Sequence, residues 1–136
     1  MAKLLVYDDD TTYREQIEKS LGKHEAIFVE TVDEVMSKLG QEQFDAVVAN
    51  VAQENENVLG LLQRAKTGFY LQKVPFICFR GPDADDLKEM DETLSMGVRM
   101  LGARAYIATD DYKSLAPALE KLLKQERPKE KGRKRR

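Results

Sequence analysis

The sequence has very few of the residues that build disulfides and metal centres. Its 136 residues include one cysteine, Cys78, and one histidine, His24. A single cysteine excludes an internal disulfide, and the two residues together give no cluster with zinc-binding spacing. We expect Cys78 to be a small buried residue of a strand and His24 to be a solvated turn residue.

Long apolar stretches and motifs of catalysis are also absent. The run at residues 4–7 contains four apolar residues, far fewer than a signal-peptide core or a membrane span of about 20 residues requires. There is no glycine-rich phosphate loop, no nucleophile elbow and no base paired with a nucleophile. We therefore expect a soluble, cytoplasmic protein that is not an enzyme and does not bind membranes. An enzyme with a repurposed α/β pocket is the weaker alternative.

Net charge is nearly absent too, because two opposite charges cancel. Residues 124–136 contain eight basic and two acidic residues and carry +6, so the formal charge of −2 leaves −8 on residues 1–123. An acidic body repels nucleic acid. We predict one domain at residues 1–126 and a disordered basic tail at residues 127–136, since the tail has no apolar anchor. We expect the tail either to contact a phosphate backbone or an acidic protein, or to serve only as a solubilising extension or a linker. Its last basic residues are Arg133, Lys134, Arg135 and Arg136.

Short apolar runs alternate with segments of helical periodicity along the whole body. The predicted strands cover residues 4–7, 26–29, 44–51, 74–79 and 103–108, and a helical segment follows each one. Thr31 and Glu34 form a capping box for the second helix, Gly97 is a possible break in the fourth, and Asp110 or Asp111 caps the fifth. Five such units predict a parallel sheet with helices on both faces.

Polar residues follow the predicted strands at the edge where such sheets carry their sites. Asp8, Asp9 and Asp10 come directly after the first strand, and Asn50 lies near the end of the third. The carboxyl ends of parallel strands meet at one edge, beside the point where strand order reverses. We expect these side chains to lie together there.

With these features the chain resembles the receiver domain of two-component response regulators. The resemblance covers roughly residues 2–124 and rests on LLVYDDD, FDAVVANV, VPFICFRG and GARAYIATD, which fall in order on the first, third, fourth and fifth strands. It implies a flavodoxin-like (βα)5 three-layer sandwich with strand order 2-1-3-4-5.

The resemblance also implies a phosphoryl-transfer reaction, but this chain lacks several of the residues that carry it out. In the family an aspartate ending the third strand accepts a phosphoryl group, and Mg²⁺ is held by it and by the acidic pair that Asp8 and Asp9 match. The nucleophile position is Asn50, whose amide is a poor nucleophile. The hydroxyl position of the fourth strand is Arg80, and the lysine position of the fifth is Thr109. The resemblance therefore implies a pseudo-receiver that signals through protein binding without phosphorylation.

Two questions about the acidic pair stay open at this stage. One interpretation of Asp8 and Asp9 is a residual, weak Mg²⁺ site; the other is a solvated acidic turn at a helix N-terminus. The guanidinium of Arg80 lies between Asp8 and Asp9, or it points to water. We interpret Asn50 as a hydrogen-bonding residue that closes its strand without chemistry.

The resemblance places the partner-binding face on the fourth helix, fifth strand and fifth helix. The residues that we expect there are Met100, Arg104, Tyr106 and Lys113. For Met90, Met96 and Met100 we expect core packing, with a partner groove as the alternative. A nucleic-acid-associated regulator that uses the basic tail is the other candidate function.

Overall fold

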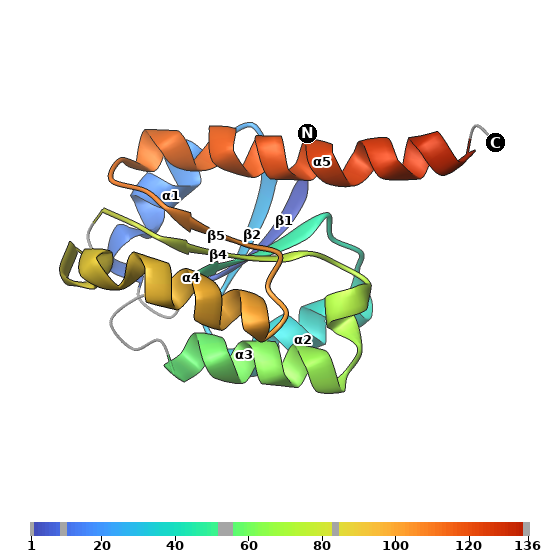
Figure 1. The fold of residues 1–136 in the computed structure, drawn as a ribbon, viewed down its shortest axis with the longest axis horizontal. Helices are drawn as coiled ribbons and strands as arrows, with labels where there is room; N and C mark the ends of the chain where they lie inside the picture. Colours follow the sequence, from blue (N-terminus) through green and yellow to red (C-terminus); the bar gives the residue numbers. More distant parts are fainter. Residues whose placement is uncertain (1, 9–10, 52–55, 83–84, 135–136) are drawn as a thin grey trace.

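A computed structural model describes residues 2–8, 11–51, 56–82 and 85–134. Its centre is one sheet of five parallel strands in the order β2-β1-β3-β4-β5 (Figure 1). The strands are β1 Lys3–Tyr7, β2 Glu25–Val29, β3 Ala46–Asn50, β4 Phe76–Arg80 and β5 Ala105–Ala108. The predicted fold class and strand order are both confirmed.

Helices cover both faces of the sheet, so the domain has three layers (Figure 1). The α-helices are α1 Arg14–Ser20, α2 Val32–Gln41, α3 Glu56–Thr67, α4 Asp91–Met100 and α5 Leu115–Lys134. Short 3-10 helices are η1 Thr11–Tyr13, η2 Tyr70–Gln72, η3 Asp85–Met90 and η4 Tyr112–Ser114. One core cluster packs α2, α3 and α4 on one face, and a second packs α1 and α5 on the other.

The central strands are buried on both faces, which explains their continuous apolar sequences. Leu4, Leu5 and Val6 of β1 are fully inaccessible to solvent, and Leu5 belongs to one core cluster while its neighbours belong to the other. Cys78 of β4 is buried as predicted, and burial raises the pKa of its thiol to about 12. This thiol is therefore protonated and inert at neutral pH.

The capping box predicted for α2 is present. The backbone N–H of Glu34 donates to Thr31 Oγ1 at 3.1 Å, and the backbone N–H of Thr31 donates to Glu34 Oε1 at 3.1 Å. A further N–H, that of Glu30, donates to the Glu34 carboxylate and is the main cause of its lowered pKa. These bonds satisfy backbone donors that the first helical turn leaves without partners.

The predicted break at Gly97 is wrong. Helix α4 continues through Gly97 to Met100, because Leu94 and Val98 on either side are buried against the sheet and hold the helix in place. The irregularity comes earlier, where η3 gives way to α4 at Asp91.

Predictions for exposed segments were less successful. His24 is not a solvated turn residue: its side chain is 7% exposed, its Nδ1 accepts the N–H of Ala2 at 3.0 Å, and its Nε2 lies 3.0 Å from Glu120 Oε2. Helix α5 continues to Lys134 and extends beyond the sheet (Figure 1), so it includes residues 127–134; the separate basic tail stays a prediction. Arg135 and Arg136 lie outside the described residues.

Candidate functional site

Four of the predicted site residues meet at the carboxyl edge of the sheet. Asn50 and Arg80 end β3 and β4, and Asp8 and Thr109 directly follow β1 and β5. The parallel register pairs Tyr7 with Ala49, Asn50 with Phe79 and Arg80 with Ala108, which sets the four strand ends side by side. Sequence order alone spreads these residues over about a hundred positions.

Asp8 and Asn50 are in direct contact. Asp8 is fully buried, and the amide Nδ2 of Asn50 donates to Asp8 Oδ1 at 3.1 Å. The hydrogen-bonding role expected for Asn50 is therefore present. Asn50 therefore presents an amide N–H to the Asp8 carboxylate. A metal cation bound to Asp8 would instead need an oxygen ligand from this position.

The described residues do not by themselves complete a metal site. Within residues 2–8, 11–51, 56–82 and 85–134 there is no group of three or more Asp, Glu, His or Cys side chains that could hold a metal ion. Asp9 and Asp10 lie outside this part of the chain. Weak binding of Mg²⁺ therefore stays a prediction.

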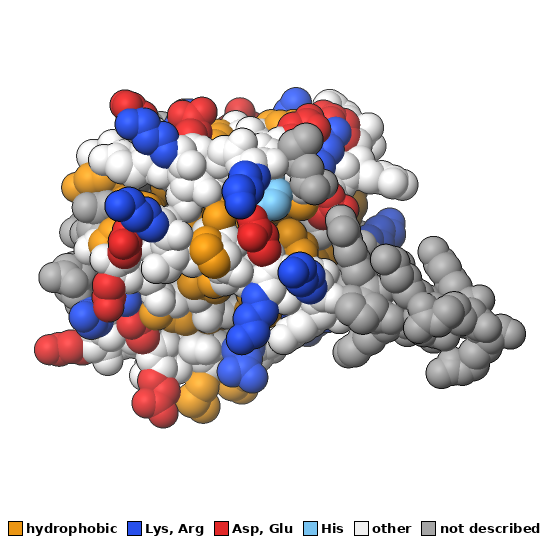
Figure 2. Space-filling view, turned by 90° about the horizontal axis from the view of Figure 1, so that it is seen from above, with side chains coloured by type: hydrophobic (Ala, Val, Ile, Leu, Met, Phe, Trp, Pro, Cys, Tyr) orange, Lys and Arg blue, Asp and Glu red, His pale blue; other side chains and the backbone are white. Residues whose placement is uncertain are grey.

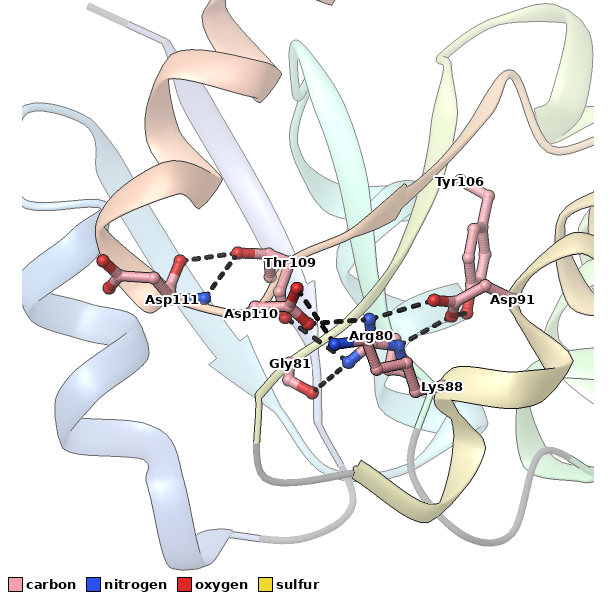
Figure 3. A network of polar contacts seen from close by, with 8 residues as sticks. All are labelled: Arg80, Gly81, Lys88, Asp91, Tyr106, Thr109, Asp110 and Asp111. Atoms are coloured by element: carbon pink, nitrogen blue, oxygen red, sulfur yellow. Dashed lines mark hydrogen bonds and ion pairs between the residues drawn. The ribbon is translucent and has the colours of Figure 1, made fainter.

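The expected exposure of Arg80 to water is wrong. Its side chain is 1% exposed and turns toward α4, while Asp9, needed for the other expected position, lies outside the described residues. Arg80 Nε donates to Asp91 Oδ1 at 2.7 Å and Nη2 donates to Asp91 Oδ2 at 3.0 Å (Figure 3). This bidentate ion pair is favourable because the planar guanidinium and the planar carboxylate have matching geometry.

The remaining guanidinium donors of Arg80 also have acceptors. Nη1 donates to the carbonyl oxygens of Gly81 at 3.1 Å and Thr109 at 3.5 Å, and Nη2 donates to Asp110 Oδ1 at 3.3 Å. Lys88 Nζ lies 3.4 Å from the other oxygen of the Asp110 carboxylate. A buried cation is tolerated in this position because its charge is paired and its donors are used.

Tyr106 completes this network from β5. Its hydroxyl donates to Asp91 Oδ1 at 2.7 Å, so one carboxylate on α4 binds side chains from both β4 and β5 (Figure 3). We call Arg80, Asp91 and Tyr106 the α4 clamp. The clamp fixes the first turn of α4 against the carboxyl ends of the two strands.

The electrostatics of the α4 clamp favour the charged carboxylates. The hydrogen bond from Arg80 is the main cause of the lowered pKa of Asp91, and Arg80 followed by Lys88 lowers the pKa of Asp110. Burial, and then the bond to Asp91, raises the pKa of Tyr106. Hydrogen bonding to Asp91 raises the pKa of Arg80. At neutral pH the guanidinium and both carboxylates are charged and the phenol is protonated.

Thr109 serves the turn that begins the last helix. Its Oγ1 accepts the N–H of Asp111 at 3.2 Å, and its hydroxyl donates to the Asp111 carbonyl oxygen at 2.5 Å. Asp111 Oδ1 in turn accepts the N–H of Lys113 at 2.9 Å, so Asp111 is the predicted cap, although it caps η4 ahead of α5. The hydroxyl at the family's lysine position is thus used locally.

The expected partner-face residues differ in accessibility. Met100 is 83% exposed, Arg104 and Lys113 are exposed, and Tyr106 is partly buried with its hydroxyl bound to the clamp. Core packing of the three methionines is wrong, because Met90 and Met96 are 44% and 59% exposed as well.

Sequence reasoning missed Asp91, and a usable signal was present. Leu87, Asp91, Leu94 and Val98 recur at the spacing of one helix face, which places a carboxylate within an apolar stripe. A charged residue in such a stripe needs a buried partner of opposite charge.

Comparisons with known proteins agree with the fold. No family model matches the chain, and no curated protein matches its sequence. Solved structures of response regulators do match. The receiver domain of a Francisella response regulator superposes with a TM-score of 0.72 at 15% identity, covering 93% of this chain and all of that one. A putative response regulator from Chloroflexus aurantiacus gives 0.72 at 19% identity, covering 90% and 97% of the two chains. NtrX from Brucella abortus gives 0.78 at 18% identity, covering 99% of this chain but 29% of NtrX. These similarities establish the fold of receiver domains.

Proposed function

We propose that this chain, which has the receiver fold, is a cytoplasmic signalling domain that binds a protein partner and is not switched by aspartyl phosphorylation. The observation that carries the proposal is the α4 clamp. In the clamp a permanent cation, Arg80, occupies the end of β4 and joins α4 to both β4 and β5. An element held by a fixed internal charge does not need a phosphoryl group to hold it.

The chemistry of the strand ends supports the same proposal. Asn50 offers a neutral amide at the position of the nucleophile, and its nitrogen is bound to Asp8. Thr109 offers a hydroxyl that is bound within its own turn. The charged nucleophile and the lysine are thus both replaced by neutral groups with local structural partners.

The proposed partner surface lies on α4 and the start of β5. Met100 and Arg104 are exposed there, and Lys113 is exposed ahead of α5. Methionine suits such a surface because its flexible, polarisable side chain adapts to different partners. The clamp would hold this surface in one arrangement, so binding would be constitutive.

A phosphoryl mimic tests the proposal directly. We expect beryllofluoride with Mg²⁺ to leave the amide NMR spectrum of the protein unchanged, while a phosphorylatable receiver domain treated in parallel shifts. Asn50→Asp, which restores the nucleophile alone, should also stay unresponsive because the lysine position is still Thr109. Stoichiometric, saturable binding of the mimic at the carboxyl edge of the native protein would overturn the proposal.

Nucleic-acid binding through the end of α5 is the second candidate. The observation that favours it is the extension of this basic helix beyond the sheet (Figure 1). Among the described side chains on the face that Figure 2 shows, acidic and basic groups are interspersed and form no continuous basic patch. Binding should therefore disappear when residues 127–136 are deleted and should fall steeply with salt. Binding of a protein partner on α4 should survive the same deletion.

A further inference from the structure

A second feature lies at the opposite edge of the sheet from the α4 clamp. There the amino ends of the strands and the neighbouring segments enclose an open cavity of about 300 Å³. In Figure 1 strands β4 and β5 run from right to left, so this amino edge faces right. The lining residues are Ala2, Phe44, Asp45, Leu71, Gln72, Lys73, Val74, Pro75, Arg104 and Leu123.

The size of the cavity suits a small organic molecule. A volume of 300 Å³ corresponds to about ten water molecules at about 30 Å³ each and lies at the lower end of the range for small-molecule sites. Its opening to solvent provides an entry path that needs no rearrangement of the core.

Six of the ten residues that line the cavity are apolar, and they alternate with polar groups that supply much of its surface. Ala2 and Val74 are buried beneath it, and Phe44, Leu71 and Leu123 are partly buried around it. The apolar part of a ligand could cover the partly buried side chains of Phe44, Leu71 and Leu123, while its polar part met the polar lining.

The backbone around the cavity is firmly held. The N–H groups of Lys73 and Val74 both donate to the Tyr70 carbonyl oxygen, at 3.0 and 3.1 Å, and the N–H of Arg104 donates to the Phe76 carbonyl oxygen at 2.7 Å. A ligand would therefore meet a largely preformed wall, which lowers the entropic cost of binding.

Two cations and one carboxylate line the cavity. The exposed side chains of Lys73 and Arg104 are cationic, and Lys73 has no ion pair within residues 2–8, 11–51, 56–82 and 85–134, although its ammonium lies 5.3 Å from the Tyr70 ring. Asp45 already uses one carboxylate oxygen, since Oδ2 accepts the N–H of Lys3 at 2.8 Å. The lining carries a net positive charge and a cation available for a carboxylate.

We propose that this amino-edge cavity binds a small organic anion, an aromatic or branched aliphatic monocarboxylate, with its apolar body against Phe44, Leu71 and Leu123 and its carboxylate beside Lys73 and Arg104. The site lies apart from the α4 clamp, although Arg104 also belongs to the proposed partner surface, and it does not depend on the loss of phosphorylation. A metabolite of this class would bind at the edge of the sheet opposite the α4 clamp and could regulate the protein from there.

Titration of the full chain with benzoate, followed by amide NMR, tests the proposal. We expect saturable shifts at residues 44–45, 72–74 and 104, with no change at Arg80. Benzyl alcohol, which keeps the ring but lacks the charge, and inorganic phosphate, which keeps the charge but lacks the ring, should each bind at least about tenfold more weakly. Shifts that stay linear in benzoate concentration, or that map to the carboxyl edge, would overturn the proposal.

Substitutions separate this site from general charge attraction. Lys73→Gln and Arg104→Gln should each weaken benzoate binding by about twofold to fivefold, as the loss of an exposed ion pair does. Lys66→Gln removes the same charge from an exposed position of α3 outside the cavity and should leave the affinity unchanged. Leu123→Trp should abolish binding by filling the space while keeping every charge. Equal affinity in the Lys73 and Lys66 variants, with the native spectrum retained, would refute the proposed site.

Discussion

Asp91→Asn is the sharpest perturbation of the α4 clamp. It removes the charge that pairs with Arg80 but keeps the size of the side chain. The Arg80 side chain is 1% exposed, so its cation cannot turn to water. It would keep one neutral amide oxygen at position 91, two carbonyl oxygens and the more exposed Asp110, but it would lose the charged partner and one of its two bonds to position 91. Breaking a buried pair costs about 3–5 kcal/mol. Since the Asp91 side chain is 25% exposed, we expect the lower end, about 3 kcal/mol.

Asp110→Asn supplies a matched control on the same guanidinium. The Asp110 side chain is 66% exposed and its oxygen lies 3.3 Å from Arg80, so its removal should cost about 0.2–1 kcal/mol. Urea denaturation followed by circular dichroism measures both free energies of unfolding. In thermal unfolding the Asp91 variant should melt roughly 12 °C below the native protein, at about 4 °C per kcal/mol.

The pH dependence of the Asp91 effect has a definite sign. Because the folded-state pKa of Asp91 is lowered, its contribution is complete above the unfolded pKa of about 4 and is lost as the pH falls through the folded value. The native protein and Asp91→Asn should differ most at pH 5–7 and converge below about pH 4. Equal stabilities of the two asparagine variants at pH 7, or a difference that grows in acid, would refute the account of the clamp.

Three further predictions concern other contacts. The raised pKa of Tyr106 means that its phenol ionises late, so a spectroscopic alkaline titration should lose a late component in Tyr106→Phe, and the stability that it contributes should be present below about pH 10 and lost above it. Thr31→Ala should lower the free energy of unfolding by about 1 kcal/mol through loss of the capping box, whereas Thr67→Ala at an exposed position should change it by less than about 0.5 kcal/mol. Gly102→Ala should destabilise the fold, because φ is +111° and an added Cβ would lie 2.5 Å from a side-chain carbon of η2. At Gly97 an added Cβ meets no atom within 4 Å, so Gly97→Ala should stabilise α4 by about 0.5–1 kcal/mol. Urea denaturation of each pair of variants measures both differences.

The sequence by itself determined the architecture of this protein. Apolar runs of strand length alternate with helical periodicity, and that alternation permits little besides a parallel sheet covered by helices on both faces. It also placed Asp8, Asn50, Arg80 and Thr109 at one edge, since every carboxyl end of a parallel sheet faces the same way.

Only the tertiary structure decided which partners these side chains take. Arg80 could reach acids on either side of its strand end, and the approach of α4 gave it Asp91, eleven positions along the chain and in a different element. Sequence periodicity describes one element at a time, whereas the direction of a long side chain depends on the elements that pack around it. The same limit applies to His24, whose Nε2 lies 3.0 Å from Glu120 of α5, and to the amino-edge cavity, whose walls come from segments distant in sequence.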